Sequence, residues 1–228
     1  MTEDRKSESP VRIDIGCGAA KREGFIGLDS VAAPGVDYVL DLTKDRFPFE
    51  DASVDYVFSS HFLEHIKIPF HVLEEIGRVC KDGARIEFWT PYAFSNEAVL
   101  YGHEIFLTEE TWMQFYKDPW ASTLRGRWLI QNINYVVLEE TEKEILENGF
   151  SVDFAIRYFK SVVCEFGVEI EFRRDPTLAP VVPRRTYSHS RVGTRFPLMN
   201  QEKPRDSDQT RRRISAGLRN RLKKLLPR

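Results

Sequence analysis

Cysteine is scarce in this chain of 228 residues, which has only 3 of them, at Cys17, Cys80 and Cys164. An odd number of widely spaced cysteines argues against a disulfide framework and fits a reducing compartment. Long apolar runs are absent too, since no stretch approaches the roughly 20 apolar residues that a membrane-spanning helix needs. The polar residues 1–10 lack the apolar segment of a secretory signal. We therefore expect a cytoplasmic protein.

An excess of charge is also missing overall, because the formal net charge is −2. That value hides an uneven distribution: residues 184–228 carry 14 Lys and Arg against 3 Asp and Glu. Leucines recur there at helical spacing among the basic residues, so we predict a basic amphipathic helix at 211–228. Such a helix suits peripheral contact with the anionic inner face of a membrane, a partner groove or the chain's own acidic part. Nucleic acid is the weakest candidate partner, because no reading module accompanies the charge.

The composition divides the chain into four segments. Residues 1–10 are expected to be a mobile leader, and residues 11–175 a single folded domain. Residues 176–210 contain five prolines and little periodicity, which is typical of a linker or arm. The predicted basic helix at 211–228 follows.

The most informative stretch is a short strand that runs into a glycine turn. Val11, Ile13 and Ile15 alternate with polar residues, and Gly16 and Gly18 then allow a sharp turn. A second predicted strand at 25–29 ends in an acidic residue. In open parallel sheets, ligands bind outside the carboxyl ends of the strands, where a carboxylate can accept hydrogen bonds from a ribose diol. This stretch therefore predicts a nucleoside-cofactor site.

Further elements follow in an order typical of an α/β fold. Strands are predicted at 37–42, 54–60 and 84–89, with a helix at 70–81 before the last of them. Beyond these we expect a helix capped by Thr108, a β-rich stretch at 127–138, a helix at 152–166 and a half-exposed strand at 168–173. This pattern indicates a largely parallel sheet covered by helices.

Taken together, the motifs resemble those of a class I S-adenosylmethionine-dependent methyltransferase. They are Asp14-Ile-Gly-Cys-Gly18, Leu28-Asp29, Asp41-Leu42 and the run from Phe47 to His65. The chain is most similar to the small bacterial type associated with polysaccharide and cell-surface genes. The resemblance implies a Rossmann-like fold with a mostly parallel, seven-stranded twisted sheet, helices on both faces and an antiparallel strand near the end. It also implies methyl transfer, with S-adenosylhomocysteine as product, to a hydroxyl of a saccharide or another small molecule.

The resemblance also implies which residues hold the cofactor. Gly16 to Gly18 would pass under its methionine part, Asp29 would bind the ribose hydroxyls, and Asp41 and Leu42 would meet the adenine. Asp14 would help to place the amine. Alternatively, Asp14 and Asp41 merely cap neighbouring backbone amides. The full predicted set is Asp14, Gly16, Cys17, Gly18, Asp29, Ser30, Asp41, Leu42 and Ser60.

Methyl transfer to a hydroxyl needs a base, and a histidine titrating near neutrality suits that task. His61 directly follows a predicted strand, so we name it as the candidate catalytic base, with a structural role as the alternative. His65 is expected to be a packed, hydrogen-bonded histidine. His103 and Glu104 lie on a later loop that could reach the acceptor.

Two other functions remain open. His61-Phe-Leu-Glu64-His65 matches H-x-x-E-H, the zinc pattern of inverted zinc peptidases. That pattern belongs inside a helix, whereas this one follows a strand, so we assign no metal ligand. A non-catalytic methyltransferase-like scaffold that binds a partner through its basic tail is the second alternative.

Overall fold

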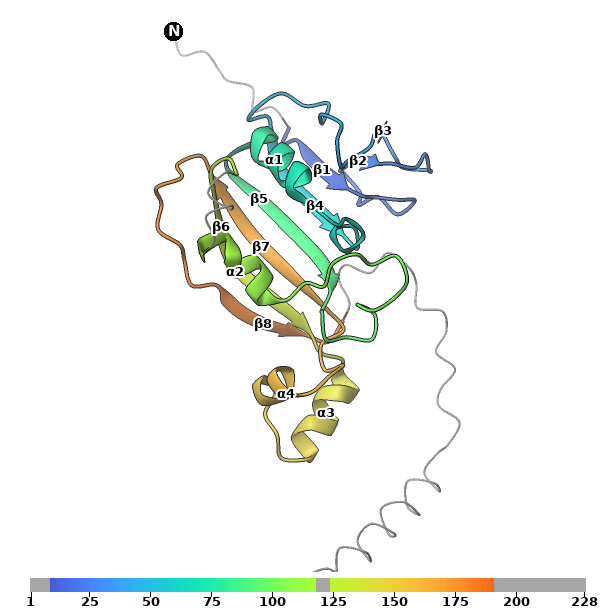
Figure 1. Cartoon of the computed structure of the whole chain (residues 1–228), viewed down its shortest axis with the longest axis vertical. Coiled ribbons are helices and arrows are strands. Elements are labelled where there is room, and N and C mark those ends of the chain that lie inside the picture. Colours follow the sequence, from blue (N-terminus) through green and yellow to red (C-terminus); the bar gives the residue numbers. More distant parts are fainter. Residues whose placement is uncertain (1–8, 118–123, 191–228) are drawn as a thin grey trace, which may run out of the picture. The chain divides into compact units, whose positions relative to one another are not determined.

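A computed structural model describes residues 9–117 and 124–190, and these residues form one eight-stranded sheet with the order β3-β2-β1-β4-β5-β7-β6-β8 (Figure 1). The strands are β1 (Arg12–Ile15), β2 (Ile26–Asp29), β3 (Tyr38–Val39), β4 (Val54–Ser60), β5 (Cys80–Pro91), β6 (Arg127–Val136), β7 (Glu165–Arg173) and β8 (Arg184–Ser188). The helices are the 3-10 turn η1 (Leu63–His65), α1 (Phe70–Val79), α2 (Glu109–Lys117), α3 (Glu139–Glu147) and α4 (Val152–Tyr158).

Strand directions make the sheet mostly parallel. The pairs β1–β2, β2–β3, β1–β4, β4–β5 and β6–β8 are parallel. The strand β7 is antiparallel to both of its neighbours, β5 and β6. The predicted mostly parallel, Rossmann-like sheet with an antiparallel strand near the end is confirmed. The number of strands differs, because β8 adds an eighth beside β6.

Helices α1 and α2 pack on the same face of the sheet (Figure 1). Val72, Ile76 and Val79 of α1 are fully buried, as their helical spacing predicts. Trp112 of α2 stacks on Phe88 of β5, with ring centroids 4.9 Å apart. This face contains most of the apolar core, and the amphipathic helices hold it out of water.

The opposite face carries a smaller apolar cluster of Phe25, Phe58, Trp89 and Val136, and none of these residues belongs to a described helix. The connections at 16–25 and 30–37 contain no helix. Phe25 from the first connection packs edge-to-face on Tyr56 and Phe58, which project from β4 on this side. The loop that contains Phe25 thus shields apolar side chains of this face from water, as a crossover helix does where the connection is longer.

Several element boundaries also differ from the sequence-based expectations. The strand predicted at 37–42 is only β3, and the helix predicted at 152–166 ends at Tyr158. Helix α3 was not predicted. Strand β8 lies within the predicted linker at 176–210. The sheet therefore continues to Ser188, beyond the expected domain end near residue 175.

Residues 1–8 of the predicted leader at 1–10, residues 191–210 of the predicted arm at 176–210 and the whole predicted basic helix at 211–228 lie outside the described residues. Membrane contact by the basic helix therefore stays a prediction. Among the helices that are described, none is both long enough and apolar enough to cross a bilayer.

Candidate active site at the carboxyl edge of the sheet

The glycine turn after β1 and the acidic residue at the end of β2 come together at one edge of the sheet. The backbone N–H groups of Gly16 and Cys17 donate to the carbonyl oxygen of Leu28, at 2.8 and 3.1 Å. The N–H of Gly18 donates to Asp29 Oδ2 at 2.7 Å, and that of Val31 to Oδ1 at 2.9 Å. A carboxylate oxygen has more than one lone pair, so Asp29 can still accept hydrogen bonds from a ligand diol.

Gly16 is required at its position for two reasons. Its φ of +67° lies in the left-handed region, and a Cβ built on it would fall 2.3 Å from Cγ of Phe62. The ring of Phe62 therefore lies directly against the glycine turn. This contact joins the turn to the segment that carries His61 and Glu64.

Three other predicted cofactor residues are buried at this edge of the sheet. Asp14 is fully buried, and its Oδ2 accepts a hydrogen bond of 2.8 Å from the Arg22 backbone N–H. Cys17 is also fully buried, and Ser60 is 1% exposed at the end of β4. For Asp14 the observed hydrogen bond matches the alternative that we left open, in which an acid at a strand end holds a neighbouring amide.

The remaining predicted residues lie just beyond β2 and β3. Ser30 is exposed. Asp41 caps a turn: hydrogen bonds from Lys44 and Thr43 lower its pKa to about 2. Leu42 is only 2% exposed and belongs to the apolar core, so contact between its side chain and an adenine would require it to become accessible.

His61 lies between two carboxylates at the centre of this edge. Its Nε2 is 2.9 Å from Glu165 Oε2 of β7, and its Nδ1 is 3.3 Å from Glu64 Oε1. Burial by itself lowers the pKa of His61, but the two carboxylates outweigh it and raise the pKa to about 9. His61 is therefore protonated at neutral pH in this arrangement. A protonated imidazole has no lone pair to accept a proton, which favours the structural alternative over the predicted base.

The H-x-x-E-H pattern does not form the metal set that its spacing suggests. Residues Leu63–His65 form a 3-10 turn, and both ring nitrogens of His61 face carboxylates. The Nδ1 of His65 instead lies 2.9 Å from the carbonyl oxygen of Gly102. The peptidase alternative lacks its paired histidine ligands here.

A pocket of about 440 Å³ opens between the ends of β5, β6 and β8 and the helices α2 and α4. Tyr92 donates to Glu109 Oε2 at 2.9 Å, and Tyr187 donates to Asp153 Oδ1 at 2.5 Å. Burial and the nearby Glu109 raise the pKa values of Tyr92 and Tyr135, so both phenols stay protonated. The other lining residues are Phe94, Thr108, Glu110, Ile156, Arg157 and Arg185.

Sequence reasoning missed this pocket, as well as Phe62 and Glu165. The tyrosines lie far apart in the chain and share no motif. Glu165 is separated from His61 by 104 positions. The strand predicted at 168–173 begins close to Glu165, and this was the sequence signal that Glu165 lies near the start of a strand.

Comparison with known proteins agrees with this architecture. Residues 28–88 match a family model described as a methyltransferase domain. A SAM-dependent methyltransferase from Archaeoglobus fulgidus has 20% sequence identity and a TM-score of 0.51, over 71% of this chain and 86% of that chain. The fold is that of a class I methyltransferase. The domain match also supports the expected S-adenosylmethionine cofactor.

Two other solved structures are less similar to this methyltransferase fold. A geranyl diphosphate C-methyltransferase from Streptomyces coelicolor A3(2) has 13% identity and a TM-score of 0.47, over 72% of this chain and 70% of that chain. A SAM-dependent methyltransferase from Aquifex aeolicus has 13% identity and a TM-score of 0.46, over 72% of this chain and 82% of that chain. No curated protein matches it.

Proposed function

We propose that the chain is an S-adenosylmethionine-dependent methyltransferase that acts on a hydroxyl of a saccharide or another small acceptor. The observation that carries the proposal is the joining of the Gly16–Gly18 turn to the Asp29 carboxylate at the carboxyl edge of the sheet. Asp29 fits such a cofactor, since its carboxylate keeps lone pairs for the ribose hydroxyls, and Gly16 and Gly18 add no side chains of their own to the turn.

When bound, S-adenosylmethionine supplies a methyl group on a sulfonium: an O–C bond forms, the C–S bond breaks with its electron pair remaining on sulfur, and the hydroxyl proton must leave. The residue that takes this proton needs to be unprotonated at neutral pH. Because His61 is held as a cation, we assign that role to Glu109, whose carboxylate lines the pocket beside Tyr92. His61 then serves as the positive charge that holds Glu64 and Glu165 in place.

The pocket lining supports a polyhydroxylated acceptor. The ring of Tyr187, which is 40% exposed, offers apolar surface to C–H groups, while Asp153 and Arg185 offer planar hydrogen-bonding groups to hydroxyls. The buried hydroxyl of Tyr135 lies close to the Glu109 carboxylate, which raises the pKa of this phenol and keeps it a hydrogen-bond donor. A mainly apolar acceptor would make none of these hydrogen bonds and would gain less from this lining.

The cofactor part of the proposal is tested by calorimetric titration with S-adenosylhomocysteine. We expect one-to-one binding that weakens at least about 10-fold in Asp29→Asn, because an amide keeps the size of the side chain but loses an acceptor oxygen. Asp82→Asn is the matched control: Asp82 lies at the opposite edge of the sheet, where it accepts a hydrogen bond from the Arg174 backbone N–H. Equal binding by both variants, or no binding by the folded wild-type protein, would contradict the cofactor site.

The acceptor part is tested by transfer of a labelled methyl group to a panel of mono- and oligosaccharides and of apolar alcohols. We expect the saccharides to be methylated, and Glu109→Gln to lower the rate at least about 100-fold with the methyl donor still bound. His61→Gln should lower the rate less than Glu109→Gln. Transfer to the apolar alcohols alone would refute the saccharide assignment while leaving the cofactor site intact.

A further inference from the structure

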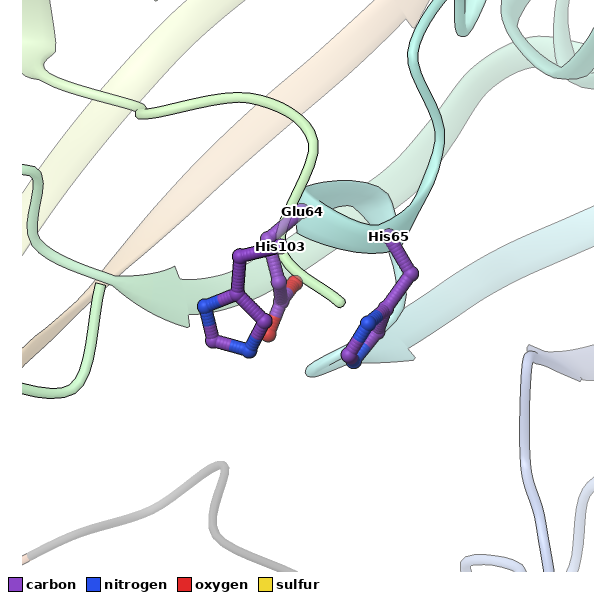
Figure 2. A group of neighbouring side chains, drawn as sticks. All are labelled: Glu64, His65 and His103. Carbon is purple, nitrogen blue, oxygen red and sulfur yellow. The ribbon is translucent and has the colours of Figure 1, made fainter. Parts of the chain in front are cut away.

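Beside the glycine turn, three side chains converge that neither the methyltransferase fold nor the proposed reaction requires. They are Glu64 and His65 of η1, and His103 from the loop after β5. One imidazole nitrogen of each histidine and one carboxylate oxygen of Glu64 all lie within 4.8 Å of one another. Figure 2 shows the three side chains extending into the same space, with the carboxylate between the two rings.

Both histidines are held in the tautomer that a metal ligand needs. The Nδ1 of His65 lies 2.9 Å from the carbonyl oxygen of Gly102, and the Nδ1 of His103 lies 3.1 Å from that of Ala98. A carbonyl oxygen only accepts hydrogen bonds, so each Nδ1 carries the hydrogen and each Nε2 of the neutral ring keeps its lone pair. Ligating histidines almost always show this second hydrogen bond, which orients the ring.

Glu64 has one buried carboxylate oxygen that no side chain faces at close range. The residue is 2% exposed. His61 Nδ1 faces Oε1 at 3.3 Å, whereas Oε2 has no hydrogen-bond partner among the described residues. Buried polar atoms normally have a partner, and buried charges are paired or coordinate a metal. A metal ion beside Oε2 would supply that partner.

We propose that Glu64, His65 and His103 bind one divalent transition-metal ion of the zinc class. Two imidazoles and one carboxylate suit Zn²⁺ far better than Mg²⁺ or Ca²⁺, which prefer oxygen ligands. Bonds of about 2.0–2.2 Å around zinc place the ligand atoms roughly 3.3 Å apart, so the set must contract by about 1.5 Å at its widest. The side chain of His65 is exposed and can rotate to make this adjustment.

Three protein ligands leave one tetrahedral position open for a water molecule or for an oxygen atom of a small molecule. That is the pattern of catalytic zinc sites, whereas structural sites have four protein ligands. His65 lines an open groove together with Lys67, Ile68 and Glu104. The site therefore has access from solvent, and metal can load without unfolding.

The proposal is tested by stripping the full-length protein with a chelator and titrating it with Zn²⁺ by calorimetry and with Co²⁺ by visible absorption. We expect one ion per chain, and at least about 10-fold weaker binding in each of His65→Ala and His103→Ala. His71→Ala is the matched control, because His71 hydrogen-bonds to the Asp45 carbonyl and takes no part in the cluster. Far-ultraviolet circular dichroism of each variant checks that it is folded.

The outcomes separate clearly. Loss of the stoichiometric ion in the two cluster variants, with retention in the control, supports the site. Equal binding by all of these proteins, or no binding by the wild-type chain, overturns it. Ligation by a cysteine would appear as a thiolate-to-cobalt charge-transfer band, and it would also overturn the proposal. None of these readouts uses S-adenosylmethionine, so failure of the metal site is distinguishable from failure of the proposed methyltransferase function.

Discussion

Replacing Arg78 by methionine should unfold the loop before β4 and lower the stability of the whole domain. The Arg78 side chain is buried in α1, where Nε and Nη2 bind the two oxygens of Glu75 at 2.8 and 2.6 Å. Its Nη1 donates to the carbonyl of Phe49 and to Asp51, and Nη2 also donates to the carbonyl of Phe47. Methionine keeps the aliphatic stem but leaves Glu75 as an unpaired buried charge. Removing one partner of a buried pair costs about 3–5 kcal/mol.

The assay is equilibrium urea unfolding of the wild type, Arg78→Met and a matched control, Arg46→Met. Arg46 also faces Asp51, at 3.4 Å, but its side chain is 71% exposed, so its loss should cost at most about 0.5 kcal/mol. Adding Glu75→Gln to Arg78→Met should recover part of the loss, because the stranded charge is then removed. A loss below about 1 kcal/mol in Arg78→Met, or equal losses in the two single variants, would refute the reasoning.

Three further predictions concern the site edge of the sheet. The pKa of His61 is about 9 in the folded protein and 6.5 in the unfolded chain, so protonated His61 stabilises the folded state. This stabilisation, about 3 kcal/mol at most, is fully present below pH 6.5 and is lost as the pH rises to about 9. Unfolding in chelator-containing buffer should show that slope in the wild type and a flatter profile in His61→Gln; parallel profiles would contradict it. Gly16→Ala forces a Cβ into the ring of Phe62, so it should lower the free energy of unfolding by about 2 kcal/mol. It should also weaken S-adenosylhomocysteine binding, measured by calorimetry. An unchanged affinity would count against the placement of the turn. In Gly167→Ala a Cβ would fall 2.5 Å from the indole of Trp89. The melting temperature should therefore drop and the tryptophan fluorescence should change. An unchanged melting temperature would show that the ring can move aside.

Local patterns predicted the part of the fold that local physics determines. The alternation at β1 and the turn at Gly16 specify a strand and a sharp reversal within a few residues, and both are observed where expected. Helix α1 was predicted because its apolar residues recur at helical spacing. Helix α3 was missed because only Ile145 of its residues is buried and no side chain caps its start. Strand β8 was missed because backbone groups hold it to β6, and backbone groups leave no pattern in the side chains from which a strand could be predicted.

Distances between remote residues could not be predicted from the sequence. The order of the motifs predicted that Gly18 and Asp29 lie close together, because Gly18 belongs to the turn after β1 and Asp29 ends the neighbouring parallel strand β2. The contact of His61 with Glu165 depends on β7 running against the other strands, which places its first residue at the carboxyl edge. The same contact changes the charge state of His61, so the predicted base could not be judged from its own surroundings in the sequence.

The helical segment between β6 and β7 leaves the sheet and returns to it at one point. Val136 and Glu165 are paired in register, and the N–H of Cys164 donates to the carbonyl of Val136 at 3.1 Å. A segment whose two ends are already neighbours can be exchanged for another of different length without shifting the strands that anchor it. Residues 138–163 carry Asp153 and Arg157 of the pocket, and they also bury Ile145, Ala155, Val162 and Val163 in the core. A grafted segment that keeps those apolar positions should alter the proposed acceptor preference while the cofactor turn stays untouched.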